Sequence, residues 1–221
     1  MFRTKICGIT SLKDAQACQR AGVGAIGLNF YRESRRRVSR ESAIEIARGL
    51  DQSVLKVGLF VNHPPAAILE ETELIGLDAI QLHGDEPLEV LDALETLPEK
   101  TRIIRAIRIS PETEKEALAR IDSWQSHPRT GAFLLDTLVT GSYGGTGKSM
   151  DWDWLARIDW PTDKPVILAG GLQPENVRHA IETVKPQGVD VAGGVEKSPG
   201  IKCPDRIRDF VETACRSFDR I

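Results

Sequence analysis

The chain has 221 residues, 41% of them hydrophobic, which is enough for one sizeable core and demands no second one. Lys and Arg number 29 against 32 Asp and Glu, and the charges are interspersed apart from the run Arg35–Arg37, so we expect no nucleic-acid partner. No apolar run could span a bilayer and the N-terminus lacks the apolar core of a signal peptide, so we expect a cytoplasmic protein without a membrane partner.

Short β-rich runs alternate with helical patterns along the chain. Eight of these runs have the length and aliphatic content of buried strands. We predict strands at Thr4–Cys7, Ala25–Asn29, Leu55–Phe60, Ala79–Leu82, Ile103–Ile107, Ala132–Asp136, Val166–Leu168 and Val189–Val191.

A helical pattern follows each strand, in several cases after a capping residue or a first-turn proline. The last pattern is the clearest, because apolar residues from Ile207 to Phe218 keep a spacing that buries one stripe of a helix. We predict helix starts near Ser11, Ser39, Pro64, Glu86, Glu112, Trp152, Pro174 and Asp205.

Eight strand–helix units predict a parallel sheet covered by helices. An open doubly wound sheet is the alternative, but such sheets usually have about five or six strands. Units of about 28 residues fit the compact end of a closed barrel. We therefore predict an α/β protein with one domain, residues 1–221, folded as a (β/α)8 TIM barrel.

Barrels of this kind carry their active sites at the C-terminal ends of the strands. Cys7 stands at such an end, in the segment KICGIT, where Gly8 begins a turn toward a helix. The other cysteines, Cys18, Cys203 and Cys215, have no CxxC spacing and no small secreted context that suggests disulfides. We expect four reduced thiols and no metal site.

Glycine pairs follow the seventh and eighth strands. Backbone N–H groups exposed at such turns can converge on an anion, and this is the usual phosphate site of barrels. Glycines also make tight turns without any ligand, but two pairs at consecutive strand ends favour a phosphate site. We predict that a phosphorylated small molecule binds at Gly170, Gly171, Gly193 and Gly194.

Two other glycine patterns are misleading. GVGAIG, from Gly22 to Gly27, matches a dinucleotide fingerprint but follows a helix and enters a strand, which is the reverse of the required order. GGTGKS ends like a nucleotide-binding loop, yet Ser142 stands where the first required glycine should be. We predict neither dinucleotide binding nor nucleotide hydrolysis.

Seven segments, in order from Lys5 to Lys202, together resemble one family. They are KICGIT, F-x-x-x-S-x-R-x-V from Phe30 to Val38, VGLFVN, QLHGDE, LLD with YGGTGK and DW, LAGGL-x-PENV, and GVDV-x-x-GVE-x-SPGIK. The family is phosphoribosylanthranilate isomerase, of tryptophan biosynthesis. The resemblance implies a TIM barrel that needs no cofactor and converts N-(5-phosphoribosyl)anthranilate, its small-molecule phosphosugar substrate, to 1-(2-carboxyphenylamino)-1-deoxyribulose 5-phosphate.

The resemblance also implies roles for single residues. The family's general base is the cysteine of KICGIT, here Cys7, and its general acid is the aspartate at the end of the sixth strand, here Asp136. Arg36 corresponds to the arginine that would hold the anthranilate carboxylate. Asp190 would contact sugar hydroxyls or a neighbouring strand-end amide. His83 would contact the substrate or a backbone carbonyl of its own turn. Monomer and homodimer are both left open.

This Amadori rearrangement requires one acid and one base. Protonation of the ribose ring oxygen by Asp136 opens the ring to an iminium, which acidifies the C2 hydrogen that Cys7 removes. The pKa of a free thiol is about 8.5. A cysteine that acts as a base at neutral pH therefore needs surroundings that stabilise its thiolate. We expect amides of the turn at Gly8, or of the helix start at Thr10 and Ser11, to stabilise the thiolate.

The chain departs from the family pattern at two places. The family's serines between VDV and GVE are replaced by Ala192 and Gly193, which removes hydroxyl donors to phosphate. Lys202 is followed by Cys203 and Pro204, where the family has aspartate, and this bears on the start of the final helix. We expect phosphate binding to be retained, because backbone amides carry most of it.

Two other classes of protein would share the phosphate loops. A different phosphosugar enzyme of barrel fold would resemble a histidine-pathway isomerase with aspartate at the first strand, or a ribulose-phosphate epimerase with metal-binding histidines. An idle phosphosugar-binding module would be free to lose Cys7 or Asp136. Because the chain has both residues and only four scattered histidines, the isomerase is favoured.

Overall fold

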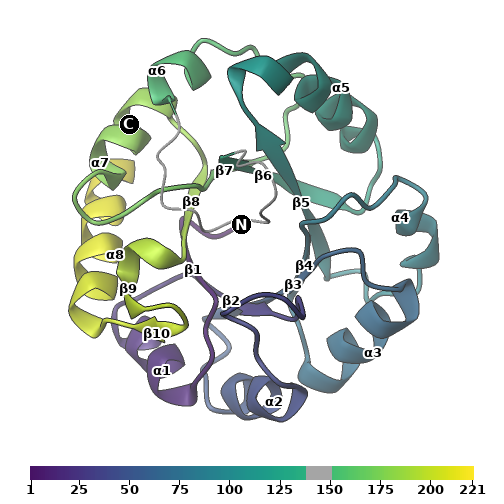
Figure 1. Ribbon diagram of the computed structural model, residues 1–221, viewed down its shortest axis with the longest axis vertical. Coiled ribbons are helices and arrows are strands. Elements are labelled where there is room, and N and C mark those ends of the chain that lie inside the picture. The colour runs from purple at the N-terminus through teal and green to yellow at the C-terminus, as the bar shows by residue number, and fades with distance from the viewer. Residues whose placement is uncertain (138–150) are drawn as a thin grey trace.

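The computed structural model describes residues 1–137 and 151–221. Eight parallel strands pair in chain order and form a closed barrel, because β1 pairs with β8 (Figure 1). The closed sheet confirms the predicted barrel and excludes the open doubly wound sheet. The strands are β1 (Thr4–Cys7), β2 (Ala25–Asn29), β3 (Leu55–Phe60), β4 (Ala79–Leu82), β5 (Arg102–Ile109), β6 (Thr130–Thr137), β7 (Val166–Leu168) and β8 (Gly188–Val191).

The predicted bounds are confirmed for β1 to β4 and for β7, whereas β5, β6 and β8 are longer than predicted. β5 and β6 lengthen together, since their pairing continues to Arg108 with Asp136 and to Ile109 with Thr137. Arginine at positions 102, 105 and 108 hid the full length of β5 in the sequence, because the prediction followed apolar residues. The longer pairing holds Asp136 in regular strand geometry at the C-terminal end of the barrel.

Helices surround the barrel and cover its outer face (Figure 1). Several begin where the sequence predicts, since Ser11 and Ser39 cap the first two helices by accepting a bond from the amide three residues further along the chain. The helices are α1 (Leu12–Arg20), α2 (Arg40–Arg48), α3 (Pro65–Ile75), α4 (Val90–Ala93), α5 (Glu114–Gln125), α6 (Trp152–Leu155), α7 (Val177–Val184) and α8 (Pro204–Phe218).

Some helix starts differ from the prediction. α4 begins at Val90, four residues after the predicted Glu86, because the Glu86 carboxylate turns inward to pair with Arg105. α7 begins at Val177, since the Asn176 side chain holds the preceding turn. A short 3-10 turn, η2 (Gly193–Val195), and an antiparallel hairpin, β9 (Glu196–Ser198) with β10 (Ile201–Lys202), follow β8 and were not predicted.

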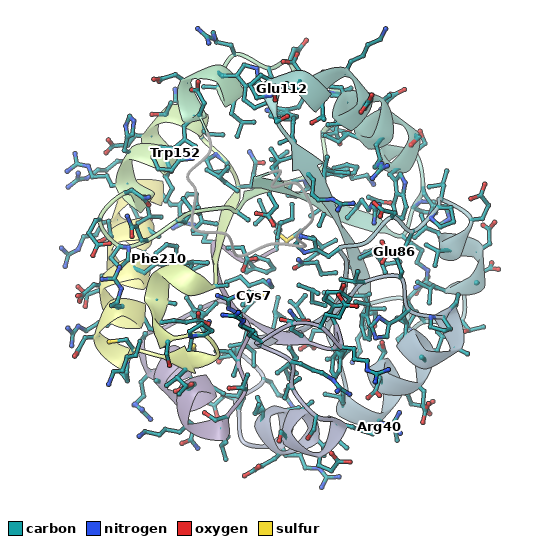
Figure 2. The ribbon with its side chains drawn as sticks, in the orientation of Figure 1. Cys7, Arg40, Glu86, Glu112, Trp152 and Phe210 are labelled. Carbon is teal, nitrogen blue, oxygen red and sulfur yellow. The ribbon has the colours of Figure 1, made fainter. Side chains whose placement is uncertain are left out.

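The core has two layers that follow the alternation of side chains along each strand. Outward-facing residues such as Ile6 and Leu28 pack against helix residues such as Phe210. Inward-facing residues fill the barrel with a smaller apolar cluster that includes Phe2 and Ile104. Cys7 lies within the ring of strands (Figure 2). In the part of the chain that the structure describes, no helix is long and apolar enough to cross a membrane.

Candidate active site

A pocket of about 250 Å³ opens at the C-terminal ends of the strands. Every site residue that the sequence analysis named lines it: Cys7, Arg36, His83, Asp136, Gly170, Gly171, Asp190, Gly193 and Gly194. Asn29, Ser34, Gln81 and Ala192 also contribute to the wall. The motif YGGTGK, and with it the candidate nucleotide loop GGTGKS, lies outside the described residues.

Cys7 is buried at the end of β1, with 6% of its surface exposed toward the pocket. Burial raises the pKa of its thiol above the ordinary value, and Asp190 adds to this rise. Lys5 and Lys202 lower the pKa of the same thiol and so oppose the effect. Nearby charges therefore act on the pKa of the Cys7 thiol in opposite directions.

Two of the turn amides next to Cys7 are engaged elsewhere in the fold. The amides of Gly8 and Ile9 both donate to the Gly27 carbonyl, at 2.9 and 3.0 Å, so they are engaged in holding the turn against β2. The Ser11 side chain is engaged as the cap of α1. The Gly8 amide is therefore unavailable to the thiolate, whereas stabilisation by the Thr10 and Ser11 amides stays a prediction. Positive charge near Cys7 comes from the side chains of Lys5 and Lys202.

Gly8 has a separate role in the turn. Its φ of 74° lies in the left-handed region, which strongly favours glycine. A Cβ there would come within 2.6 Å of Cδ of Arg36, so the missing side chain also makes room for the arginine that crosses the turn.

Asp136 and His83 meet across the pocket wall. His83 Nε2 lies 3.2 Å from Asp136 Oδ2, and both side chains are buried. Gln81 Nε2 lies 2.8 Å from His83 Nδ1. With the Gln81 amide donating to Nδ1, a neutral His83 carries its proton on Nε2, toward the Asp136 carboxylate.

Arg36 reaches the pocket from the loop between β2 and α2. Its Nε and Nη2 donate to the two carboxylate oxygens of Glu196, at 2.8 and 2.9 Å. This bond to Glu196 raises the pKa of Arg36. Lys202 binds the same carboxylate at 2.9 Å and also donates to the Cys7 and Ala192 carbonyls, at 2.6 and 3.0 Å. The hairpin β9–β10 is thereby tied to the end of β1.

The turns that carry the two glycine pairs approach each other closely. Gly170 and Gly171 adopt φ values of 83° and 68°, which L-residues rarely accept. Among the described residues, neither of their amides donates a hydrogen bond. A Cβ on Gly194 would lie 1.9 Å from the Leu172 carbonyl oxygen, so only glycine allows the β8 turn to approach the β7 turn this closely.

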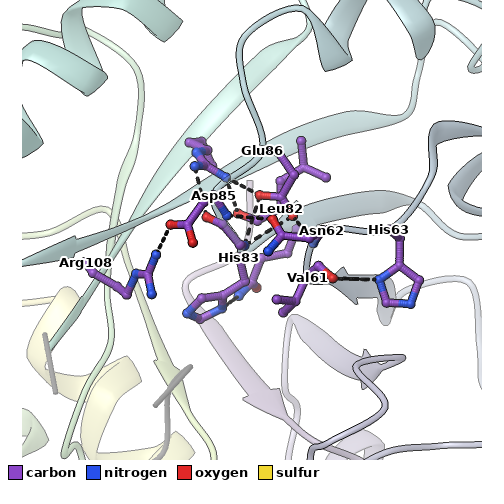
Figure 3. Close-up of polar contacts among 11 residues, drawn as sticks. Val61, Asn62, His63, Leu82, His83, Asp85, Glu86 and Arg108 are labelled. Atoms are coloured by element: carbon purple, nitrogen blue, oxygen red, sulfur yellow. Dashed lines mark hydrogen bonds and ion pairs between the residues drawn. The ribbon is translucent and has the colours of Figure 1, made fainter. Parts of the chain in front are cut away.

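The turn after β4, which carries His83, is fixed by a buried ion pair. Glu86 pairs with Arg105 at 2.6 Å and accepts bonds from the amides of Asn62 and Gly84, at 2.7 and 2.9 Å (Figure 3). Nearer the barrel mouth, Arg108 pairs with Asp85 (Figure 3). The sequence predicts a helix start near Glu86, whereas the structure shows Glu86 as the anchor of this turn.

A family model for N-(5'-phosphoribosyl)anthranilate (PRA) isomerase matches residues 4–213 of the chain. The N-(5'-phosphoribosyl)anthranilate isomerase of Geobacter sulfurreducens is 45% identical over 214 residues, which cover 97% of this chain and 98% of that one. The chain belongs to the phosphoribosylanthranilate isomerase family.

Solved structures of this family have the same architecture. The isomerase from Thermotoga maritima superposes with a TM-score of 0.85 at 39% identity, covering 98% of this chain and all of that one. Another, with a TM-score of 0.82 at 36% identity, covers 98% of this chain and was solved with reduced 1-(o-carboxyphenylamino)-1-deoxyribulose 5-phosphate. The chain is thus a phosphoribosylanthranilate isomerase of tryptophan biosynthesis, as the motifs predicted.

Several charged residues that lie behind the pocket lining of this isomerase were not singled out from the sequence. Lys5 shares a strand face with Cys7, and this i, i+2 spacing could have identified it. Glu196 and Lys202 come together with Arg36 only through the hairpin β9–β10. No local pattern reveals such a contact, because it joins residues about 160 positions apart, as the pair of Arg36 with Glu196 shows.

Proposed function

We propose that Cys7 is the general base and Asp136 the general acid of this isomerisation. The observation that supports the assignment most strongly is that both side chains, from β1 and β6, line one pocket together with Arg36 and the two glycine pairs. An acid, a base and two anion sites are what a substrate with a carboxylate at one end and a phosphate at the other requires.

In this mechanism the acid acts first. Asp136 gives its proton to the ribose ring oxygen, the bond from C1 to that oxygen breaks, and the nitrogen lone pair forms the iminium. The Cys7 thiolate then takes the C2 proton, and the electrons of that C–H bond form the C1–C2 double bond as the iminium becomes an enolamine. His83 holds the Asp136 carboxyl group in place through the contact at Nε2.

The phosphate group binds at the glycine turns in this proposal. The amides of Gly170 and Gly171 support this, since they point to no acceptor in the described chain. The serines that Ala192 and Gly193 replace are not required, because an anion at such a turn is held chiefly by backbone N–H groups. A Cβ on Gly193 would lie 3.2 Å from Nη2 of Arg36, so glycine relieves crowding there.

The anthranilate carboxylate binds Arg36 in this proposal. Glu196 occupies the Nε edge of the guanidinium. A second carboxylate can therefore bind only at the remaining N–H groups on Nη1 and Nη2, which still present two parallel donors. Asp190 also lines the pocket and would bind sugar hydroxyls.

We also propose a homodimer as the solution state. The isomerase of T. maritima, from which monomers were generated, is dimeric, and one such monomer structure has a TM-score of 0.79 with this chain. Sedimentation velocity measures the state directly. A monomer across the accessible concentration range would contradict the proposal.

The catalytic assignment is tested by Cys7→Ser and Asp136→Asn, with the half-buried Cys215→Ser as matched control. Each site variant should lose about 10² to 10⁴ in kcat, the range for removal of a general acid or base, and still bind the reduced product analogue. The loss of anthranilate fluorescence during turnover gives kcat. Parental kcat in either variant would disprove that residue's role.

A further inference from the structure

Lys5 is a charged residue that the mechanism above does not use. It lies two residues before Cys7 on β1, so both side chains point into the barrel, and it is fully buried. It is not among the residues that line the pocket, so it lies one layer deeper than the thiol. A buried ammonium group is costly unless anions surround it, which calls for an explanation of its presence.

Two groups face the Lys5 ammonium. Nζ donates to Asp190 Oδ1 on β8 at 3.0 Å, and both side chains are buried. A Cβ built on Gly27 of β2 would lie 2.7 Å from Cys7 Sγ and 3.1 Å from Lys5 Nζ. The thiol and the ammonium therefore converge on the same point of β2, where a residue with a side chain would separate them.

The charges around the thiol come from four elements. Lys5 lies on β1, Asp190 on β8 and Lys202 on β10, and Arg36 approaches from the loop after β2. The carboxylate of Glu196 binds both Arg36 and Lys202, and Lys202 directs its other bonds to backbone carbonyls. Lys5 is thus the cation whose described contacts are limited to Asp190 and the thiol itself.

We propose that Lys5 is the positioning residue of the base, which stabilises the Cys7 thiolate by facing its Sγ while Asp190 keeps the ammonium group charged. This role rests on the proposed function of Cys7. The electrostatic evidence agrees with it: burial would lower the pKa of Lys5, but Asp190 and Cys7 together raise it. Asp190 consequently has two roles, because it keeps the Lys5 ammonium group charged beside Cys7 and would also bind sugar hydroxyls.

The test measures ionisation of the thiol in the free protein. Carbamidomethylation of Cys7 by iodoacetamide is followed against pH by mass spectrometry in the parent and in Lys5→Met. The matched control is Lys56→Met, which removes a partly buried strand lysine paired with Asp78. In Lys5→Met the pH profile of the alkylation rate should move to higher pH by at least about one unit. The alkylation rate at neutral pH should then fall about tenfold or more, while the control variant should match the parent.

The acid limb of kcat/KM in Lys5→Met should move with the alkylation profile and KM should change little. A purely structural lysine would leave both profiles where they are. An alkylation profile in folded Lys5→Met that coincides with the parent's would therefore overturn the proposal.

A second measurement needs no lysine variant, so it tests the proposal even if Lys5→Met does not fold. The Lys5 Cε chemical shift in 13C-lysine protein should show a step at the pH where Cys7 ionises, and Cys7→Ser should abolish this step. A Lys5 Cε chemical shift that shows no step at the pH where Cys7 ionises would overturn the proposal. Full turnover by Cys7→Ser would instead remove the proposed function and leave the measured coupling intact.

Discussion

Arg36 binds Glu196 with one edge of its guanidinium, and in the proposed mechanism another edge binds the anthranilate carboxylate. Arg36→Met should raise KM by about tenfold or more, because a charge-assisted bond is worth about 1.5–3 kcal/mol. The exposed neighbour Arg35 is the matched control, and Arg35→Met should change KM little, since exposed charges contribute about 1 kcal/mol or less. Steady-state kinetics gives both values.

Inhibition constants separate the two anion sites in the same variants. If Arg36 binds the carboxylate, Arg36→Met should weaken inhibition by anthranilate and leave inhibition by inorganic phosphate nearly unchanged. Gly193 lies close to Arg36, so a selective loss of phosphate inhibition would move this arginine to the phosphate end and contradict the assignment.

Cys18 predicts a pH dependence of stability. Burial raises its pKa from the ordinary 9.0 to about 12 in the folded protein. Between these pH values the unfolded chain loses the thiol proton and the folded chain keeps it, so the stabilisation is complete below about pH 9 and is lost as pH rises. The slope should be on the order of 1 kcal/mol per pH unit.

Urea unfolding of Cys18→Ala against the parent checks this dependence. The variant's stability should fall less steeply with pH over that alkaline range, whereas Cys203→Ala, at a half-buried thiol, should follow the parent. Parallel curves for parent and Cys18→Ala would show that this thiol does not contribute.

The residues carried over from the resemblance all line the pocket, whereas the environment of Cys7 could not be predicted. The burial and the charge of Lys5, Asp190 and Lys202 depend on the β1–β8 pairing and on the hairpin after β8. A thiol's ionisation is determined by such neighbours, so the local sequence around KICGIT suggested the proposed base but not the lysine side chains that act on its pKa.

At the scale of elements, the sequence predicts strands better than helix starts. Strand interiors in a barrel are apolar on both faces, and this pattern is local. The start of α4 depends on where Glu86 directs its carboxylate, and its partner Arg105 is on another strand. The polar network of Figure 3 therefore replaces a first helical turn that the sequence alone favours.

This network makes Glu86→Ala a severe change. It leaves the Arg105 guanidinium buried without its carboxylate, so the free energy of unfolding should fall by about 3–5 kcal/mol. The exposed Glu89, at the N-terminal end of α4, is the control, and Glu89→Ala should stay within about 0.5 kcal/mol. Chemical denaturation measures both, and equal stabilities would contradict an anchoring role.

For the whole molecule, closure of the barrel is what assembles the site. β1 and β6, which carry Cys7 and Asp136, are brought to one pocket because β8 returns to pair with β1. Eight strand–helix units were enough to predict this closure. The proposed division of the pocket into a base side, an acid side and two anion ends rests on the family resemblance as well as on the residues themselves.

In the proposed mechanism, Cys7 breaks the C2–H bond after Asp136 has acted at ring opening. The most direct test is the isotope effect on kcat of substrate deuterated at ribose C2, measured in Cys7→Ser and Asp136→Asn. We expect a primary isotope effect in Cys7→Ser, where proton removal limits the rate, and none in Asp136→Asn, where ring opening limits it. The reverse pattern, or no effect in either variant, would contradict the assignment of base and acid.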